Sequence, residues 1–189
     1  LTLRYGADKA RELWDISQDA KSLVKELIDK LDIDCDYQSD VLHISQRKLR
    51  VQDFNVYAEQ LYKDYGYDKF EVIEGPDIQN YIASPKYKAA LLDRGSAHIH
   101  PLNFALGLAA AVRSKGVRIY ERSRFREKIK GEPAILKPLT GQVRADHVIL
   151  ACNAHLEGLE KRIRGHIMGI NSYALTTEAL DPELAKKLF

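Results

Sequence analysis

The chain has 189 residues, of which 45% are hydrophobic and 30% are charged. This composition is typical of a chain that buries a core, and the length predicts one domain or two small ones. Lys and Arg number 29 and Asp and Glu number 27. Because the charges nearly balance, they give no electrostatic reason to expect a nucleic acid or an anionic membrane as a partner.

The cysteines and the lengths of the hydrophobic runs indicate the cellular compartment that we expect for the chain. Cys35 and Cys152 share no CxxC spacing, so we expect no disulfide framework and a reducing cytoplasm. No apolar stretch is long enough to span a bilayer. The chain begins at Leu1 without an initiator Met and ends soon after Asp181-Pro182, a pattern typical of a helix start. We therefore expect an internal piece of a larger protein.

The first half of the chain predicts alternating helices and short strands. Apolar residues at steps of three and four predict an amphipathic helix from Ala7 to Leu31. Ser39-Asp40 is expected to form a turn between two strands. The elements expected in chain order are a helix over 7–31, strands over 33–37 and 41–44, a helix over 49–65, a strand over 70–73 and a short helix over 75–83.

The second half predicts a helix followed by many strands. Pro101 is well placed to open the helix, and Lys115-Gly116 to end it. The uniformly apolar run 147–152 is expected to be a strand covered on both faces. The elements expected in this half are strands over 87–92 and 117–120, a helix over 101–115, a meander over 125–130, 134–139 and 142–145, and strands over 147–152 and 167–177.

Three segments resemble the D-amino-acid oxidase-like family of FAD-dependent oxidoreductases, which includes glycine oxidase and sarcosine oxidase. They are residues 97–101 (AHIHP), 116–121 (GVRIYE) and 147–154 (HVILACNA). The resemblance extends over nearly the whole chain. It implies a mixed α/β and α+β fold, with part of a Rossmann-like FAD-binding domain, an antiparallel meander, and part of a sheet-and-helix substrate domain.

The resemblance also implies how the chain is divided between these domains. Residues 1–90 would belong to the substrate domain, and residues 91–155 to the returning part of the FAD-binding domain. Residues 156–189 would re-enter the substrate domain. In this family the chain passes between the two domains more than once.

The chemistry implied by the resemblance is amine oxidation. A small-molecule amine would give a hydride from its α-carbon to the FAD, and the resulting imine would be hydrolysed. Dioxygen would reoxidise the flavin and release hydrogen peroxide. The branch that this chain resembles implies a primary amine on a charged, extended chain. The cofactor carries the chemistry, and the protein orients it.

The glycine-rich signature GxGxxG, which lets backbone approach the FAD diphosphate, does not occur in this sequence. Hydrogen bonds to charged groups contribute roughly 1.5–3 kcal/mol each, whereas micromolar affinity is only about 8 kcal/mol. We therefore expect the isolated chain to be inactive and not to retain FAD. We also expect it to self-associate, because missing neighbours would leave sheet edges and apolar surface open.

Candidate site residues follow from the same resemblance. The backbone of Phe125 would meet the adenine, and the run Ala151, Cys152 and Asn153 would end beside the diphosphate and ribose. His43 and Tyr173 are candidates for the substrate pocket. The sequence offers no matched motif for a catalytic residue.

The alternating pair His98 and His100 lacks a third ligand at useful spacing, so we expect no metal site. Two other functions stay open. One is a non-catalytic ligand-binding or interaction domain of the same fold. The other is a dehydrogenase-type relative that passes electrons to a partner instead of to oxygen.

Overall fold

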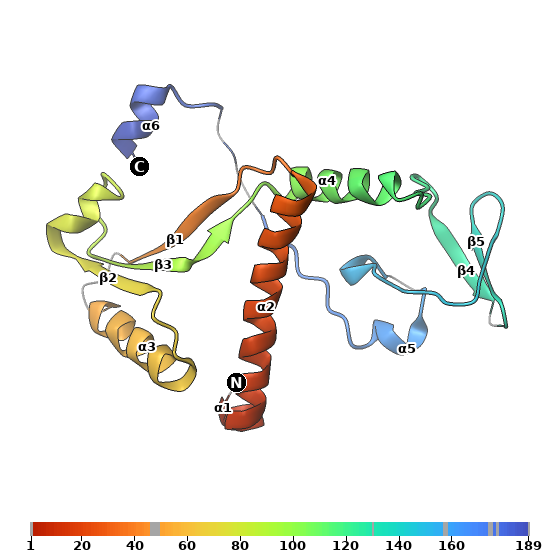
Figure 1. Ribbon diagram of the computed structural model, residues 1–189, viewed down its shortest axis with the longest axis horizontal. Helices are drawn as coiled ribbons and strands as arrows, with labels where there is room; N and C mark the ends of the chain where they lie inside the picture. Colours follow the sequence, from red (N-terminus) through yellow and green to blue (C-terminus); the bar gives the residue numbers. More distant parts are fainter. Residues whose placement is uncertain are drawn as a thin grey trace. The chain divides into compact units, whose positions relative to one another are not determined.

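The computed structural model describes residues 2–45, 50–129, 131–156, 159–173, 176 and 178–188. They form two compact units (Figure 1). Unit 1 comprises Leu1–Val117 and Ala179–Phe189, and unit 2 comprises Arg118–Glu178. The expected boundary between residues 90 and 91 falls inside a strand of unit 1. The assignment of 1–90, 91–155 and 156–189 to substrate and cofactor domains stays a prediction.

Unit 1 begins with a short helix, α1 (Thr2–Tyr5), and a long one, α2 (Ala7–Leu31), whose predicted bounds are confirmed. Asp32 ends α2 in the left-handed region, with φ of 50°, and donates its N–H to the carbonyl of Ile28. Ala10 and Ile28 are the buried residues of this helix. Among the described helices, none is long and apolar enough to cross a membrane.

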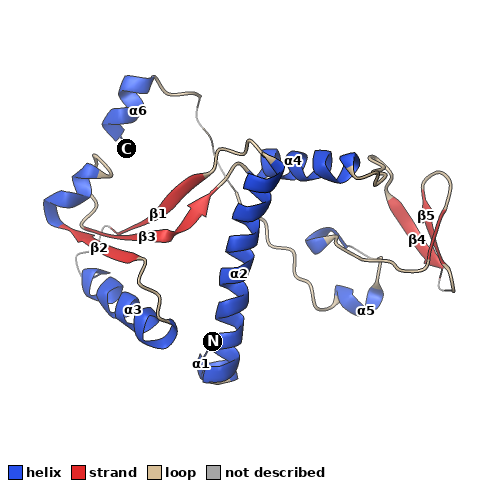
Figure 2. Ribbon diagram, in the orientation of Figure 1, coloured by secondary structure: helices blue, strands red, loops and turns tan. Residues whose placement is uncertain are grey.

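A three-stranded antiparallel sheet forms the centre of unit 1 (Figure 2). It consists of β1 (Gln38–Ser45), β3 (Ala89–His98) and β2 (Phe70–Glu74), in the order β1-β3-β2. The predicted strand at 70–73 is therefore confirmed. β3 is buried over its first five residues, as expected for a central strand with a neighbour on each side.

Two expectations near β1 are wrong. Residues 33–37 are not a strand, because Asp36 has φ of 50° and interrupts the extended backbone. This segment is held instead by burial of Ile33 and Cys35 and by backbone hydrogen bonds, from Ile33 N to the Ile28 carbonyl at 3.0 Å and from His100 N to the Cys35 carbonyl at 2.7 Å. Ser39-Asp40 does not form a turn. Both residues lie in β1, where a register shift accommodates Asp40 at φ 70°.

Two buried clusters stabilise unit 1. One lies where β2 and β3 meet the short 3₁₀ helix η1 (Gly75–Asn80), which ends earlier than the expected 75–83. The other lies where α2 meets the following segment. The buried members of the first are Ile73, Ile78, Ala90 and Leu92, and those of the second are Ile28, Ile33 and Cys35. The helix α3 (Arg50–Tyr65) contacts β2 and β3.

The helix α4 (Pro101–Ser114) starts at the proline that predicts it. The ring of His100 caps the helix, because its Nδ1 accepts a hydrogen bond from Asn103 N at 3.2 Å. Gly107 allows close packing, since an added Cβ there would lie 2.4 Å from Cγ2 of Ile33. The last helix, α6 (Pro182–Leu188), also belongs to unit 1.

Unit 2 is a meander followed by irregular chain. Its antiparallel strands β4 (Phe125–Ile129), β5 (Ala134–Pro138) and β6 (Val143–Ala145) confirm the predicted meander. The 3₁₀ helix η2 (Asn153–Leu156) and the one-turn helix α5 (Lys161–Arg164) follow.

The predicted strands at 41–44 and 87–92 correspond to parts of β1 and β3, whereas those at 117–120, 147–152 and 167–177 are wrong within the described residues. Residues 117–120 and 147–152 have no regular secondary structure, and Ile149 is 90% exposed. Their sequences favour extended backbone, but a strand also needs a neighbour, and each described sheet pairs only its own three strands. Residues 167–173 and 176 carry no strand, and residues 174, 175 and 177 of that prediction lie outside the described residues.

Candidate functional site

Unit 2 contains a cleft of about 970 Å³, here called the unit 2 cleft. Its lining comes from the start of β4, from the residue after β5, and from the chain around η2. The lining residues are Arg124, Phe125, Arg126, Leu139, Cys152, His155, Leu156 and Leu159. The cleft therefore brings together residues that are far apart in the sequence.

Local backbone geometry positions each wall of the unit 2 cleft. Leu139 N donates to the Arg124 carbonyl at 3.2 Å, which extends the β4–β5 pairing by one bond. On the other wall Asn153 has φ of 49°, a left-handed conformation that Asn tolerates well. The tight turn is closed by His155 N donating to the Cys152 carbonyl at 3.0 Å. The turn brings Leu156 into the interior, where it is 5% exposed.

Two of the four predicted cofactor-binding residues line this one cleft. Phe125 comes from β4 and Cys152 from the end of the apolar run. Ala151 and Asn153 flank Cys152 in the chain and are exposed. The structure thus places the predicted residues near one another, while their role toward a cofactor stays a prediction.

The two arginines of the unit 2 cleft were not predicted from the sequence as site residues. Arg124 and Arg126 flank Phe125 in the chain, and His155 also lines the cleft. A guanidinium stays charged at all physiological pH values and matches the geometry of phosphate oxygens. The signal available in the sequence was the Arg-Phe-Arg triplet beside a residue already chosen, and the spacing alone gave no reason to include its neighbours.

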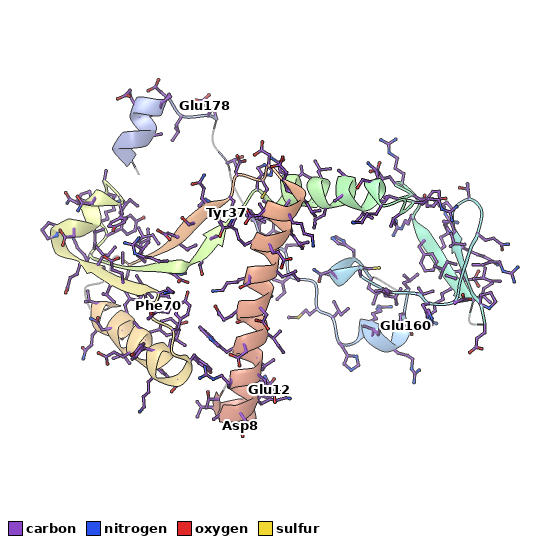
Figure 3. All side chains as sticks on the ribbon, in the orientation of Figure 1. Asp8, Glu12, Tyr37, Phe70, Glu160 and Glu178 are labelled. Carbon is purple, nitrogen blue, oxygen red and sulfur yellow. The ribbon has the colours of Figure 1, made fainter. Side chains whose placement is uncertain are left out.

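Unit 1 contains a second cleft of about 510 Å³ between α3 and the sheet, here called the unit 1 cleft. Figure 3 labels Phe70, which begins β2 and contributes to this cleft. The lining residues are His43, Asp53, Phe54, Tyr57, Phe70, Leu91 and Asp93. Aromatic rings and two carboxylates therefore share one hollow.

Asp93 is the buried charged residue of the described chain, with 7% exposure. Its Oδ1 accepts hydrogen bonds from Tyr67 Oη at 2.5 Å and from Gly95 N at 3.0 Å, and its Oδ2 accepts one from Ser96 Oγ at 2.5 Å. Burial raises the pKa of the Asp93 carboxyl, but the three hydrogen bonds and the nearby charge of Lys21 outweigh burial, and the net shift is downward. Asp93 is therefore ionised at neutral pH.

Tyr67 shows the complementary behaviour. Burial raises the pKa of its hydroxyl, and the hydrogen bond to Asp93 raises it further. The hydroxyl thus stays protonated and acts as a donor to the carboxylate. Neither residue was singled out from the sequence, because the contact joins residues 26 positions apart and no local pattern announces it.

The other residues predicted from the sequence have fewer described contacts. His43 is exposed and lines the unit 1 cleft. Tyr173 belongs to unit 2, is 89% exposed and is not one of the residues that line either cleft. His98 ends β3 and His100 caps α4. Among the described residues, no group of three or more His, Cys, Asp or Glu side chains could hold a metal ion.

Residues 2–188 match the family described as FAD dependent oxidoreductase (DAO). The chain belongs to this family. The predicted membership of the D-amino-acid oxidase-like FAD-dependent oxidoreductases is thereby confirmed over most of the chain.

Two curated relatives of the FAD-dependent oxidoreductase family are similar along nearly the whole chain. Gamma-glutamylputrescine oxidoreductase of Escherichia coli (strain K12) is 34% identical over 185 residues, which cover 97% of this chain and 43% of the relative. Probable oxidoreductase OrdL of Haemophilus influenzae is 30% identical over 187 residues, covering 96% of this chain and 43% of the relative. The chain thus spans less than half the length of the relatives it matches.

A solved structure of the same family supports the fold. Glycine oxidase from Geobacillus kaustophilus aligns with a TM-score of 0.65 at 17% identity, over 78% of this chain and 41% of that structure. At this identity the likeness concerns the fold alone. The predicted fold class, a mixed α/β and α+β chain related to part of an FAD-dependent oxidase, is confirmed.

Proposed function

We propose that the full-length protein is an FAD-dependent amine oxidoreductase, and that its substrate is gamma-glutamylputrescine or a closely related primary amine. The observation that carries the FAD part is the meeting of Phe125 and Cys152 in one cleft flanked by Arg124 and Arg126. The substrate is inferred from the 34% identity to gamma-glutamylputrescine oxidoreductase.

The unit 2 cleft fits the dinucleotide part of FAD in its chemistry. Arg124 and Arg126 provide positive charge for a diphosphate. The small side chain of Ala151 and the left-handed Asn153 (φ 49°) let the backbone approach a ligand. The backbone of Phe125, a residue that lines the cleft, would contact the adenine. Together these residues would hold and orient the cofactor.

When bound, FAD would accept the hydride from the α-carbon of the amine and then reduce dioxygen to hydrogen peroxide. The imine product would be hydrolysed in water. The residues of this chain would orient the cofactor, and His43 and Tyr173 remain the proposed contacts to substrate. We propose no proton transfer by His43 or Tyr173, because no described contact of either side chain indicates one.

The isolated 189-residue chain is proposed to be inactive. It lacks the GxGxxG signature, so the donors that would neutralise the diphosphate are fewer than the whole protein would supply. It is also proposed to self-associate, because Ile149, Met168 and Ile170 are 90%, 78% and 77% exposed. Stoichiometric flavin absorbance in the purified chain would contradict the expected inactivity. A monodisperse monomer by light scattering would contradict the expected self-association.

The test of the proposed function uses the purified full-length protein. Its absorbance is scanned from roughly 350 to 500 nm for the bands of a bound flavin. A panel of primary amines, including gamma-glutamylputrescine, is then added while peroxide release is recorded. We expect bound FAD and amine-dependent peroxide. Reduction of an artificial dye without peroxide would indicate a dehydrogenase. If neither dye reduction nor peroxide release is seen, a non-catalytic domain is the better explanation.

A matched pair of variants tests the unit 2 cleft. Arg126→Gln removes a cleft-lining charge, and Arg144→Gln removes an exposed charge from β6, outside the lining. We expect Arg126→Gln to weaken FAD binding by about tenfold or more, since hydrogen bonds to charged groups contribute roughly 1.5–3 kcal/mol. Arg144→Gln should retain FAD. Equal FAD content in the two variants would remove Arg126 from the proposed cofactor site.

A further inference from the structure

The unit 1 cleft has an aromatic wall whose rings support one another. The Phe70 ring lies 5.6 Å from that of Tyr57 and 5.0 Å from that of Tyr67, measured between centroids. Trp14 continues the row, edge-on to Tyr67 at 5.3 Å and stacked on Tyr65 at 4.5 Å. Because each ring contacts the next, two of the rings that line the cleft, Tyr57 and Phe70, are restrained before any ligand arrives.

The lining of the unit 1 cleft changes with depth. Tyr57, at the mouth, is 50% exposed, and Phe54 and Phe70 are half-buried. The floor consists of Leu91 and Asp93, which are 3% and 7% exposed. A buried carboxylate therefore belongs to a hollow that is otherwise lined by aromatic and aliphatic side chains and by His43 and Asp53.

The charge of the floor is only partly compensated. Among the described residues, no lysine or arginine lines the unit 1 cleft. Lys21, which attracts the Asp93 carboxylate, is held by a hydrogen bond from its Nζ to the Gly95 carbonyl at 3.0 Å and lies 5.3 Å from the Tyr67 ring. The carboxylate has about four acceptor positions, and three protein donors occupy three of them.

We propose that the unit 1 cleft binds an alkylammonium ion, attracted by Asp93 and held against the faces of Tyr57 and Phe70. Aromatic faces attract organic cations within about 6 Å of the ring centre. A bare metal cation would need a shell of oxygen ligands, whereas this lining is mostly aromatic and aliphatic carbon. The inference deepens the proposed function and rests on it, because His43, a proposed contact to the amine substrate, lines the same cleft. Binding itself requires only residues of unit 1 and no electron transfer.

The probe that tests this site is tetramethylammonium. Its nitrogen has no lone pair and cannot form an imine, so binding is measured without turnover. Titration calorimetry on the full-length protein compares this ion with tert-butanol, a neutral molecule of similar size. We expect tetramethylammonium to bind at least about tenfold more tightly, with an affinity that falls as salt is added. Equal binding of the two probes, or no binding of the ion, would overturn the proposal.

Three variants locate the binding. Asp93→Asn should weaken tetramethylammonium binding by about tenfold or more, because it removes the charge of the floor. Tyr57→Leu should weaken it by about threefold through loss of the ring face. Tyr62→Leu is the matched control, because Tyr62 lies on the same helix, is 64% exposed and is not a lining residue. It should bind like the unaltered protein.

The comparison of Tyr57→Leu with Tyr62→Leu keeps the proposal testable even where Asp93→Asn fails to fold, which circular dichroism would reveal. Identical affinities in these two tyrosine variants would contradict the proposed site. The readout is also separate from that of the proposed function. A protein without peroxide release that still binds tetramethylammonium supports the cleft, and a protein with peroxide release but no such binding refutes it.

Discussion

Unit 1 and unit 2 each contain a three-stranded antiparallel sheet, but only the first builds a core on it. Among the described residues, every buried apolar side chain except Ala134 and Leu156 lies in unit 1. In unit 1 a 3₁₀ helix and α3 pack against the sheet. In unit 2 strand β4 presents exposed charged residues such as Arg126 and Glu127, and Ile149 is 90% exposed.

The difference shows what a small sheet needs to become a stable layer. Backbone pairing alone leaves both faces of a sheet open to water, and a second layer must cover one of them. Because unit 1 has that layer within this chain, substitutions inside it should cost stability directly. Because unit 2 does not, most substitutions there should be tolerated in this chain. The following predictions test that contrast.

The largest effect is expected from Leu92→Ala in β3. Leu92 is 4% exposed in the cluster with Ile73 and Ile78, and truncating a buried leucine costs about 2–5 kcal/mol. Urea unfolding followed by circular dichroism measures the loss. Val143→Ala in β6, where the side chain is 46% exposed, should cost less than about 1 kcal/mol. Similar losses for the two variants would break the contrast between the units.

A smaller effect, with a distinctive pH dependence, is expected from Asp93→Asn. At neutral pH it should cost about 1.5–3 kcal/mol, because the buried charge accepts three hydrogen bonds. The pKa of Asp93 lies below its ordinary value of 3.8, so its stabilisation is present above pH 4 or so and is lost as the pH falls through the lowered pKa.

The difference in unfolding free energy between Asp93→Asn and the unaltered chain should therefore shrink below about pH 4. Urea unfolding repeated from pH 7 to pH 3 measures it. Asp29→Asn is the control, because its ion pair with Lys25 is exposed and should contribute less than about 1 kcal/mol. A difference for Asp93→Asn that does not change with pH would contradict the assigned ionisation.

Gly107→Ala tests the close approach of α4 to Ile33. The new Cβ would lie 2.4 Å from Cγ2 of Ile33, so we expect a loss of about 1–3 kcal/mol from overpacking. The loss should be smaller in an Ile33→Ala background, which a double-mutant cycle measures. Gly165→Ala in unit 2 meets no atom within 4 Å and should be close to neutral. Equal effects at the two glycines would show that α4 does not pack as described.

The smallest effect is expected from Ile149→Ala in this chain, within about 0.5 kcal/mol, because the side chain is exposed. In the full-length protein the same change should cost about 2–5 kcal/mol, provided that the run 147–152 is a central strand there, as its composition predicts. Thermal or urea unfolding of both proteins measures the two values. A small cost in both would refute the predicted central strand.

The sequence predicted helices better than strands, for a physical reason. A helix closes its hydrogen bonds within its own segment, so periodicity and a proline sufficed for α2 and for the start of α4. A strand depends on a partner that may lie far away in the chain. The runs 117–120 and 147–152 have the composition of strands, but their sequences do not tell which segment would pair with them.

The sites divide in the same way. Phe125 and Cys152 were predicted through the family resemblance, and the structure brings them into one cleft. Asp93 was missed because its partner Tyr67 is 26 residues away and Asp-Arg in a strand looks like an ordinary exposed pair. Arg124 and Arg126 were missed because charge beside a strand residue is usually solvated. Long-range contacts, rather than unusual residues, account for what the sequence did not reveal.

The junction between β3 and α4 has a mechanical consequence. Only Ile99 and His100 separate the middle strand from the helix, and His100 is fastened twice, through its N–H to the Cys35 carbonyl and through its ring to Asn103 N. Because this connection is short and hydrogen-bonded, we expect a tilt of the strand to be transmitted to α4.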